Sequence, residues 1–465
     1  MSAIPGDVDT EQQPPMTIPL RHFLVGVGLL VSGGTVGVLD AIGYVPGLGV
    51  LAQTHLLLAG WVCVTIMGAM TQFVPVWSNV ALHSRRLATA QLWFVTVGVA
   101  GMAAAFATGA LGWVHAFGGL AVLGFWTFCY NLGRTLLAAR PWDVTERHFA
   151  LALTCLLAVP AMGFALAMDF TVPFLAESAL SRPRLLAAHA TLAVFGVILL
   201  TVLGALYQLA TMFTQTELHG VDLQLRRVEE VGYPLGVLTL ATGRLLGWAP
   251  LARVGGLLVA LALLGFSVVL ARRLVETQVA WTPMLSRYAV VAVAMAAWAL
   301  STLPVWLADP LAQTALFGGG PVHLLVFGVV GFVVLGTLYH VVPFIVWVHS
   351  YSDLLGYEQV PMIDDLYDDR IATADFGCIL GGALGLAVAA VAGLPGFVTA
   401  AAGTLATVGF SLFALNMVLV VREHGPDSIR SVMLTTRSPT TPGEDRSDEG
   451  LSAEDATAAH EDVTP

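Results

Sequence analysis

The sequence predicts an all-α polytopic membrane protein with twelve transmembrane helices in three pseudo-symmetric four-helix repeats. Three observations lead to this prediction: the scarcity of charge, the length of the apolar runs, and a pattern that recurs along the chain. Only 11% of the 465 residues are charged, 57% are hydrophobic and the mean hydropathy is +0.81, whereas an average soluble domain is about a quarter charged. This composition excludes a soluble enzyme, a nucleic-acid-binding protein and a disulfide-stabilised domain.

The apolar runs are long enough for helices that cross a bilayer, because one span needs about 20 apolar residues. The first twenty residues are polar and rich in proline, so they are not a signal peptide. The predicted helices cover residues 20–42, 50–78, 86–109, 111–138, 147–170, 183–213, 228–247, 251–272, 287–308, 319–348, 370–394 and 396–421.

Arginine accounts for all 20 basic residues, and the net charge is −11, a balance that suits a halophile. The arginines favour alternate loops, and the positive-inside rule then places both termini in the cytoplasm of a multi-pass cell-membrane protein. The predicted parts are a cytoplasmic N-terminal segment 1–17, a membrane domain 18–422 (repeats of about 18–140, 146–275 and 286–422), and a disordered acidic cytoplasmic tail 423–465.

The internal repeat is clearest in the second and tenth predicted helices. At identical spacing, the second has His55, Gly60, Gly68 and Pro75, and the tenth has His323, Gly328, Gly336 and Pro343. The sixth helix joins this register if Thr191 takes the histidine's place, and His189 then lies two residues too early. Recurrence of this kind determines the architecture, so we expect three copies of one four-helix unit.

Histidine is costly inside a membrane and is functional by default. His55, His189 and His323 begin the second, sixth and tenth helices and His115 begins the fourth, so we expect all four in the outer part of the bilayer. Neutral imidazole is a standard ligand of haem iron and other metals. The alternative is a histidine at the membrane interface that only hydrogen-bonds a backbone carbonyl. This alternative is favoured more for His115 than for the other three histidines.

A second polar group is expected at the inner ends of the same helices. His340 lies 17 residues below His323, about 25 Å along a helix, so the two cannot share one iron. Such a group could relay protons or simply hydrogen-bond helices to each other, and the second interpretation is favoured. Its expected members are Tyr207, Gln208, Tyr339, His340 and Gln72, with Thr71.

The second helix carries two family resemblances. It reads His55-Leu-Leu-Leu-Ala-Gly-Trp61 and, after Ile66-Met-Gly-Ala69, ends in Val74-Pro75. With histidines on helices two, six and ten, this resembles subunit I of the haem-copper oxidase and nitric oxide reductase superfamily. The end of the helix, Val74-Pro75-Val-Trp77-Ser-Asn79, is also similar to the NnrS family of twelve-helix haem and copper proteins.

The resemblance implies that His55 and His323 ligate one b-type, low-spin haem. His189 falls on the helix that supplies a copper ligand in the oxidases, but Ala193 stands where they carry a tyrosine, and residues 231–248 lack their histidine pair. A copper centre needs about three imidazoles, so copper lacks its usual ligands and ordinary oxygen reduction is not expected. His115 and His189 remain candidates for an unusual metal site.

The expected function is electron transfer or binding of a small gas, nitric oxide or oxygen, and whether the chain is an enzyme stays open. The alternatives are a cofactor-free transporter or channel on the same fold and an NnrS-like protein of the nitric oxide response. The expected partners are the lipid bilayer, a gas ligand, and an electron donor or partner subunit, but no nucleic acid.

Overall fold

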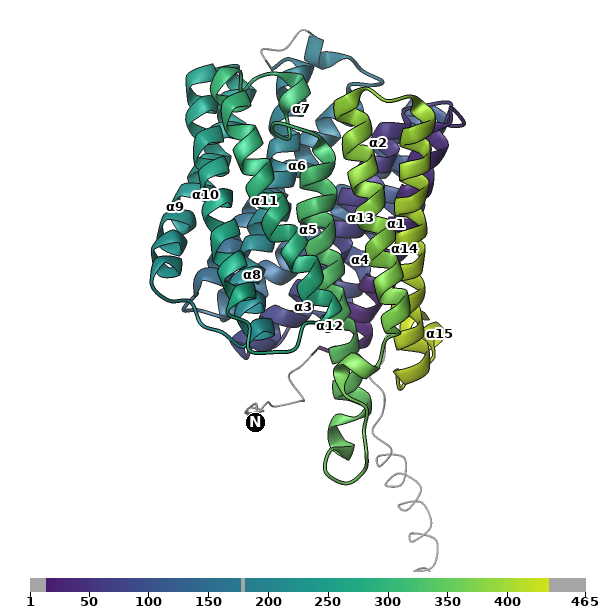
Figure 1. Ribbon diagram of the computed structural model, residues 1–465. Helices are drawn as coiled ribbons and strands as arrows, with labels where there is room; N and C mark the ends of the chain where they lie inside the picture. The colour runs from purple at the N-terminus through teal and green to yellow at the C-terminus, as the bar shows by residue number, and fades with distance from the viewer. Residues whose placement is uncertain (1–13, 177–179, 435–465) are drawn as a thin grey trace, which may run out of the picture.

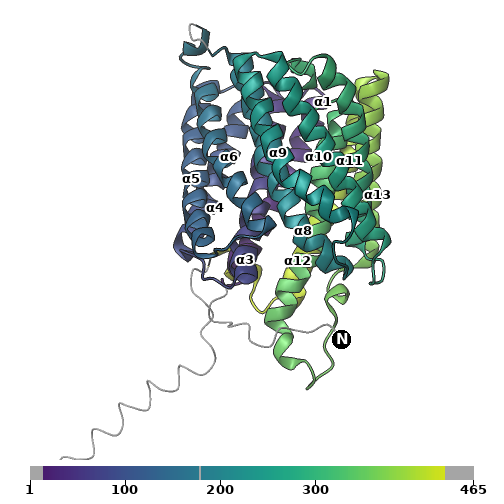
Figure 2. The same ribbon diagram turned by 90° about the vertical axis from the view of Figure 1, so that its left-hand side faces the viewer.

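The computed structural model describes residues 14–176 and 180–434 (Figure 1). Within these ranges the regular structure is helical, and the single isolated β-bridge joins Leu355 and Glu358. Long helices run alongside one another in a bundle, and their connections lie at its two ends (Figures 1 and 2). The first long helix, α1 (Thr17–Ala41), packs against the last, α14 (Gly396–His424), so the chain closes on itself.

Three of the long helices are composite, with a π-helical stretch of eight residues inside each. The first consists of α2 (Gly49–Thr54), η1 (His55–Val62) and α3 (Cys63–Ser78); the second of α7 (Arg182–Thr191), η4 (Leu192–Leu199) and α8 (Leu200–Thr214); the third of η6 (Leu324–Gly331) and α12 (Phe332–Ser350). The other helices are α4 (Arg85–Thr108), α5 (Val114–Ala138), α6 (Val144–Met168), α9 (Val221–Leu246), α10 (Ala249–Val275), α11 (Pro283–Ala308), α13 (Asp369–Ala392) and the short α15 (Ile429–Leu434).

Eleven helices of the described chain are long and apolar enough to cross a membrane. Large apolar side chains such as Leu157, Leu261 and Val293 are exposed on their outer faces, where water would disfavour so much apolar surface but lipid would not. The chain is therefore a polytopic helical membrane protein. The helix that falls outside this set is α9, because six of its 26 residues are charged.

The apolar patterning located the helices well, and the largest error is at α9. The predicted start at residue 228 is seven residues late, because Asp222 and its charged neighbours read as a loop. The tail was also predicted to begin too early: α14 continues to His424 and α15 follows, with Val432 buried and its carbonyl bound by Arg21 Nε at 2.8 Å. Residues 1–13 and 435–465, the rest of both predicted terminal segments, lie outside the described residues.

Two of the three composite helices lie deepest in the bundle. The most apolar windows of residues 182–214 and 324–350 are 72% and 78% buried, whereas that of α13 is 22% buried. The π-helical stretches of all three begin at corresponding places, four or five residues before Gly60, Gly196 and Gly328. A π-helical turn is rare and marks functional sites more often than chance. His55 begins the first stretch and His323 directly precedes the third.

Candidate functional site

The predicted outer histidines are half-buried, and two of them are held in a defined protonation pattern. His55 Nδ1 lies 2.7 Å from the carbonyl oxygen of Leu51, and His189 Nδ1 lies 3.0 Å from that of Val159. Because a carbonyl can only accept, each ring carries its proton on Nδ1 and keeps a lone pair on Nε2. This is the arrangement in which a histidine serves as a metal ligand.

The structure brings His55 close to His189. Their imidazoles are near enough to interact electrostatically. Phe106, 5.4 Å from His55 between ring centroids, borders the same region together with Phe170. The sequence placed these two histidines at similar depth but paired His55 with His323 instead.

His323 lies at the start of the third composite helix, beside aromatic rings. Its imidazole stacks on Phe327 at 5.9 Å, and its Nδ1 is buried without a hydrogen-bond partner. From Phe327 the aromatic contacts continue to Phe410 at 6.0 Å and from there to Trp61 at 6.4 Å. An apolar aromatic layer therefore joins the neighbourhood of His323 to the helix that carries His55.

These residues fit a haem in their donor chemistry. His55 has an uncommitted Nε2 and lies beside Phe106, and His323 has a buried and uncommitted Nδ1 and lies beside Phe327. Apolar aromatic rings of this kind are what a porphyrin contacts. His115 likewise has a buried Nδ1 without a partner. Among the described residues, no three His, Cys, Asp or Glu side chains come together as a metal-binding group, so a three-imidazole copper centre is not formed there.

A second set of polar residues lies near the opposite end of the bundle, where α1, α6 and α11 begin. It is made of three clusters, which we call polar junctions, one in each of three chain segments (residues 17–138, 144–275 and 283–424). In the second segment Glu229 Oε1 lies 3.2 Å from His148 Nε2, and its Oε2 accepts a hydrogen bond from Tyr207 at 2.8 Å. All three side chains are buried.

The polar junction of the third segment has the same arrangement, with an arginine in the place of the histidine. Arg287 binds one carboxylate oxygen of Asp375, and Tyr339 donates to the other. Asn416 Nδ2 donates to the Tyr339 hydroxyl at 3.1 Å and so ties α14 to the cluster. The ion pair is completely enclosed, since Arg287 is 1% exposed and Asp375 is 0% exposed.

The polar junction of the first segment has neutral residues at the corresponding places. His22 stands for His148 and Arg287, Thr71 for the two tyrosines and Gln91 for the carboxylates. The correspondence is geometric as well: a Cβ added to Gly68 would meet His22 Cβ at 2.5 Å, one added to Gly204 would meet His148 at 2.6 Å, and one added to Gly336 would meet Arg287 at 3.0 Å. A Cβ at Gly68 or Gly204 would clash with the facing helix, and one at Gly336 would force a small shift, so glycine permits these close helix contacts.

The predicted inner polar group is distributed over several places. Tyr207 and Tyr339 belong to different polar junctions. Gln208 is exposed, His340 packs with its ring 4.4 Å from Phe213, and Gln72 is buried with its Oε1 unpartnered. These residues therefore do not form one cluster.

The residues that sequence reasoning missed are the partners of these tyrosines. Glu229, Asp375, His22, His148 and Arg287 are not among the site residues that the sequence predicts. A usable signal was present, because Gln91, Glu229 and Asp375 each lie seven residues after a capping or first-turn residue: Ser84, Asp222 and Asp368.

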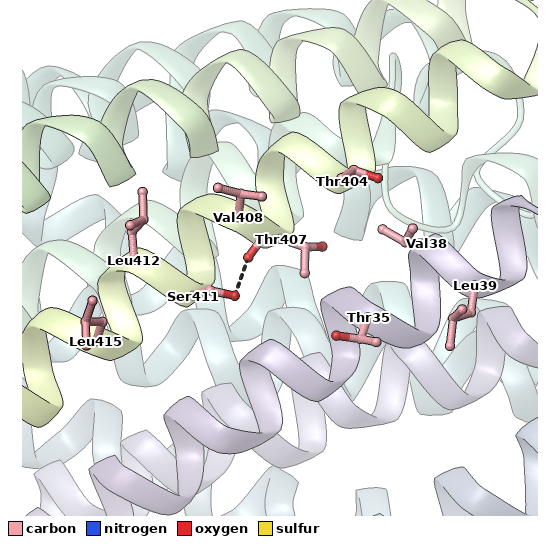
Figure 3. A pocket seen from close by; sticks show the side chains of 9 residues that line it. All are labelled: Thr35, Val38, Leu39, Thr404, Thr407, Val408, Ser411, Leu412 and Leu415. Carbon is pink, nitrogen blue, oxygen red and sulfur yellow. Dashed lines mark hydrogen bonds between the residues drawn. The ribbon is translucent and has the colours of Figure 1, made fainter.

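A groove lies elsewhere, on the outer surface between α1 and α14 (Figure 3). Its volume is about 380 Å³. The hydroxyls of Thr35, Thr404, Thr407 and Ser411 line it, but each donates to a carbonyl of its own helix. The groove is thus apolar in character and contains none of the predicted site residues.

Comparison of the sequence with models of known protein families and with curated proteins finds no match.

Proposed function

We propose that this chain is a membrane protein of twelve transmembrane helices in three four-helix repeats, built like subunit I of the haem-copper oxidase superfamily. Three recurring features support the proposal. Each segment has a π-helical stretch at the same place, a glycine against the first helix of the segment, and a polar junction. In this proposal α9 is the seventh span, with its charged first half at the membrane surface, and both termini are cytoplasmic.

We further propose that the protein binds one b-type haem between His55 and His323, for electron transfer or for binding nitric oxide or oxygen. The observation that carries this proposal is the pair of uncommitted imidazole nitrogens. His55 begins one π-helical stretch, His323 directly precedes another, and the contacts of Phe327, Phe410 and Trp61 join the two helices. A haem with two imidazole ligands supplies one-electron redox chemistry. The chain's contribution is to orient His55 through the Leu51 carbonyl and to exclude water with Trp61, Phe327 and Phe410.

Optical spectra of the purified protein test the haem proposal. Expressed with iron and haem precursors, the protein should show a Soret band that shifts on reduction. His55→Ala and His323→Ala should each remove or strongly alter it. His340 is half-buried and packs against Phe213 and Phe344, so His340→Ala should leave the band unchanged. A colourless wild-type protein would contradict the proposal and favour a transporter or channel, for which metal-dependent or proton-coupled uptake in vesicles is the assay.

A second ligand pairing deserves its own variant, because His55 lies close to His189. His189 also keeps an uncommitted Nε2. If His55 and His189 share a metal, His189→Ala should change the spectrum or the metal content as much as His55→Ala does. If the haem lies between His55 and His323, His189→Ala should leave the Soret band in place. An iron and copper count on the same samples separates a haem from a bound copper ion.

A role in the nitric oxide response remains a third proposal, and it rests on the resemblance of the second helix alone. Deletion of the gene should then raise the sensitivity of the cell to nitric oxide.

A further inference from the structure

The polar junction of the first segment contains buried polar atoms that no group of residues 14–176 and 180–434 satisfies. His22 Nε2 and both amide atoms of Gln91 are enclosed without a hydrogen-bond partner, although His22 is 1% exposed and Gln91 is 0% exposed. The same is true of Thr65 Oγ1 and Gln72 Oε1. A buried polar group without a partner is unfavourable in a folded protein, so several of them on neighbouring helices point to a bound molecule.

The three helices that carry these atoms, α1, α3 and α4, pack against one another. Ile18 of α1 packs with Ala88 of α4, and both helices start at the same end of the bundle. His22 lies one turn beyond Ile18 and Gln91 lies three residues beyond Ala88, so the two side chains are at the same level on neighbouring helices. Thr65, Gly68 and Gln72 share one face of α3, and Gly68 is the residue that contacts His22.

The polar junctions of the second and third segments have two groups that the first segment lacks. There a carboxylate binds the cation and a tyrosine hydroxyl reaches the same carboxylate. The Thr71 side chain is too short to reach a side chain at the carboxylate's place on the neighbouring helix. Its hydroxyl donates instead to the Gly68 carbonyl in its own helix, at 2.8 Å. The first segment therefore replaces a phenol and a carboxylate with smaller or neutral groups.

The chemistry of the donors and acceptors selects a neutral ligand. His22 Nδ1 lies 2.8 Å from the Ile18 carbonyl, so it carries the proton and Nε2 needs a hydrogen-bond donor. An inorganic anion without a proton offers no donor. A metal cation would face the buried guanidinium of Arg21 on the next residue, with no carboxylate among the side chains named here to compensate it.

We propose that this polar junction is a binding site for water inside the membrane domain. Ordered water donates to His22 Nε2 and exchanges hydrogen bonds with the Gln91 carboxamide, in the space that a tyrosine and a carboxylate fill in the second and third segments. Buried waters of this kind join otherwise unsatisfied polar groups and are part of a folded structure. The site is independent of the haem proposal.

Hydroxyl-radical footprinting of the full-length protein in nanodiscs, in ¹⁸O-labelled water, tests this inference. Radicals formed from a bound water oxidise the side chain beside it. His148 is the matched control, because it is equally buried at 1% exposure but is bound to Glu229. His22 should be labelled several-fold faster than His148. Equal labelling of the two histidines would overturn the proposal.

The double variant Thr71→Tyr with Gln91→Glu rebuilds the second-segment arrangement in the first segment. If water occupies the site, the new side chains should displace it and reduce labelling of His22 to the level of His148. Labelling of His22 that stays high in the folded double variant would contradict the proposed location. The comparison of His22 with His148 in the wild-type protein needs no variant, so the test stands if the double variant does not fold.

Discussion

The polar junctions of the first and third segments occupy equivalent places but satisfy their polar groups in different ways. The third encloses a full ion pair, Arg287 with Asp375, and closes it with Tyr339. The first has His22, Gln91 and Thr71, with unpartnered buried nitrogen and oxygen atoms. Common to both is the contact of a glycine on the composite helix with the first helix of the segment. Backbone packing therefore maintains the arrangement, and the polar chemistry within it has diverged.

The second segment lies between these two cases. Its carboxylate, Glu229, binds a histidine rather than an arginine. Histidine can become neutral, whereas arginine keeps its charge in a protein. Loss of the carboxylate should therefore cost less stability in the second segment, which has Glu229, than in the third, which has Asp375. The predictions below test that order.

The largest effect is expected for Asp375→Asn in the third segment. This change leaves the buried Arg287 guanidinium without its carboxylate, and breaking a buried ion pair on one side costs about 3–5 kcal/mol. The free energy of unfolding in mixed micelles, measured by titration with sodium dodecyl sulfate, should fall by that amount. The double variant Asp375→Leu with Arg287→Met should recover most of the loss. A loss below about 1 kcal/mol would mean that water or lipid headgroups reach the pair.

Tyr339→Phe should have the next largest effect. It removes the hydroxyl that donates to Asp375 and accepts from Asn416. Hydrogen bonds to charged groups contribute about 1.5–3 kcal/mol, and the same titration measures the loss. Tyr207→Phe is the matched variant in the second segment. Because Tyr207 has no partner corresponding to Asn416 in its hydrogen bonds, a larger loss for Tyr207→Phe would contradict the comparison.

Glu229→Gln should be milder than Asp375→Asn, because His148 can remain neutral when the carboxylate is gone. The expected loss is about 1–2 kcal/mol, the range for one unfavourably replaced hydrogen bond. Equal losses in the two variants would show that His148 is as firmly charged as Arg287. The variant also gives the second segment the Gln91 chemistry of the first, so footprinting of His148 should increase if Gln at this position admits water.

The smallest effect concerns the opposite end of the bundle, where Asp169 follows α6. The backbone N–H of Leu175 and the Arg182 guanidinium, 2.7 Å away, lower the pKa of this carboxyl below its ordinary value. A lowered pKa in the folded state contributes stability above the ordinary aspartate pKa, and that contribution is lost as the pH falls through the folded pKa. Asp169→Asn should therefore lower the melting temperature slightly at neutral pH and leave it nearly unchanged at a pH below the folded pKa, so that the acid side of the melting-temperature profile becomes flatter.

Most helix positions could be predicted from the sequence because a bilayer demands long apolar runs. α10 and α12 show this well, since their apolar lengths leave no other interpretation. α9 shows the limit, because Asp222 and Glu229 lie in an amphipathic first half whose partners come from other helices. Arg272 and Arg273 of α10 bind Asp222 at 2.7 and 2.8 Å. Local sequence does not reveal that compensation.

The sequence was enough to select the histidines of the candidate site, but not to tell which of them lie close together. His55, His189 and His323 stand out in an apolar chain, and two of them prove to be held through Nδ1 as a ligand would be. The proximity of His55 to His189, and the aromatic layer of Trp61 and Phe410 near His323, depend on helices distant in the sequence.

The sequence by itself determined that this is a helical membrane protein, that its polar groups are few, and that one pattern of histidine, glycine and proline recurs. Composition and periodicity are enough for these conclusions because lipid excludes unsatisfied backbone and most charge. Only the tertiary structure decided which polar groups meet. Gln91, Glu229 and Asp375 differ little as isolated residues at helix starts, and what separates them is the group that the facing helix presents: an unpartnered histidine nitrogen, a bound histidine or a buried arginine.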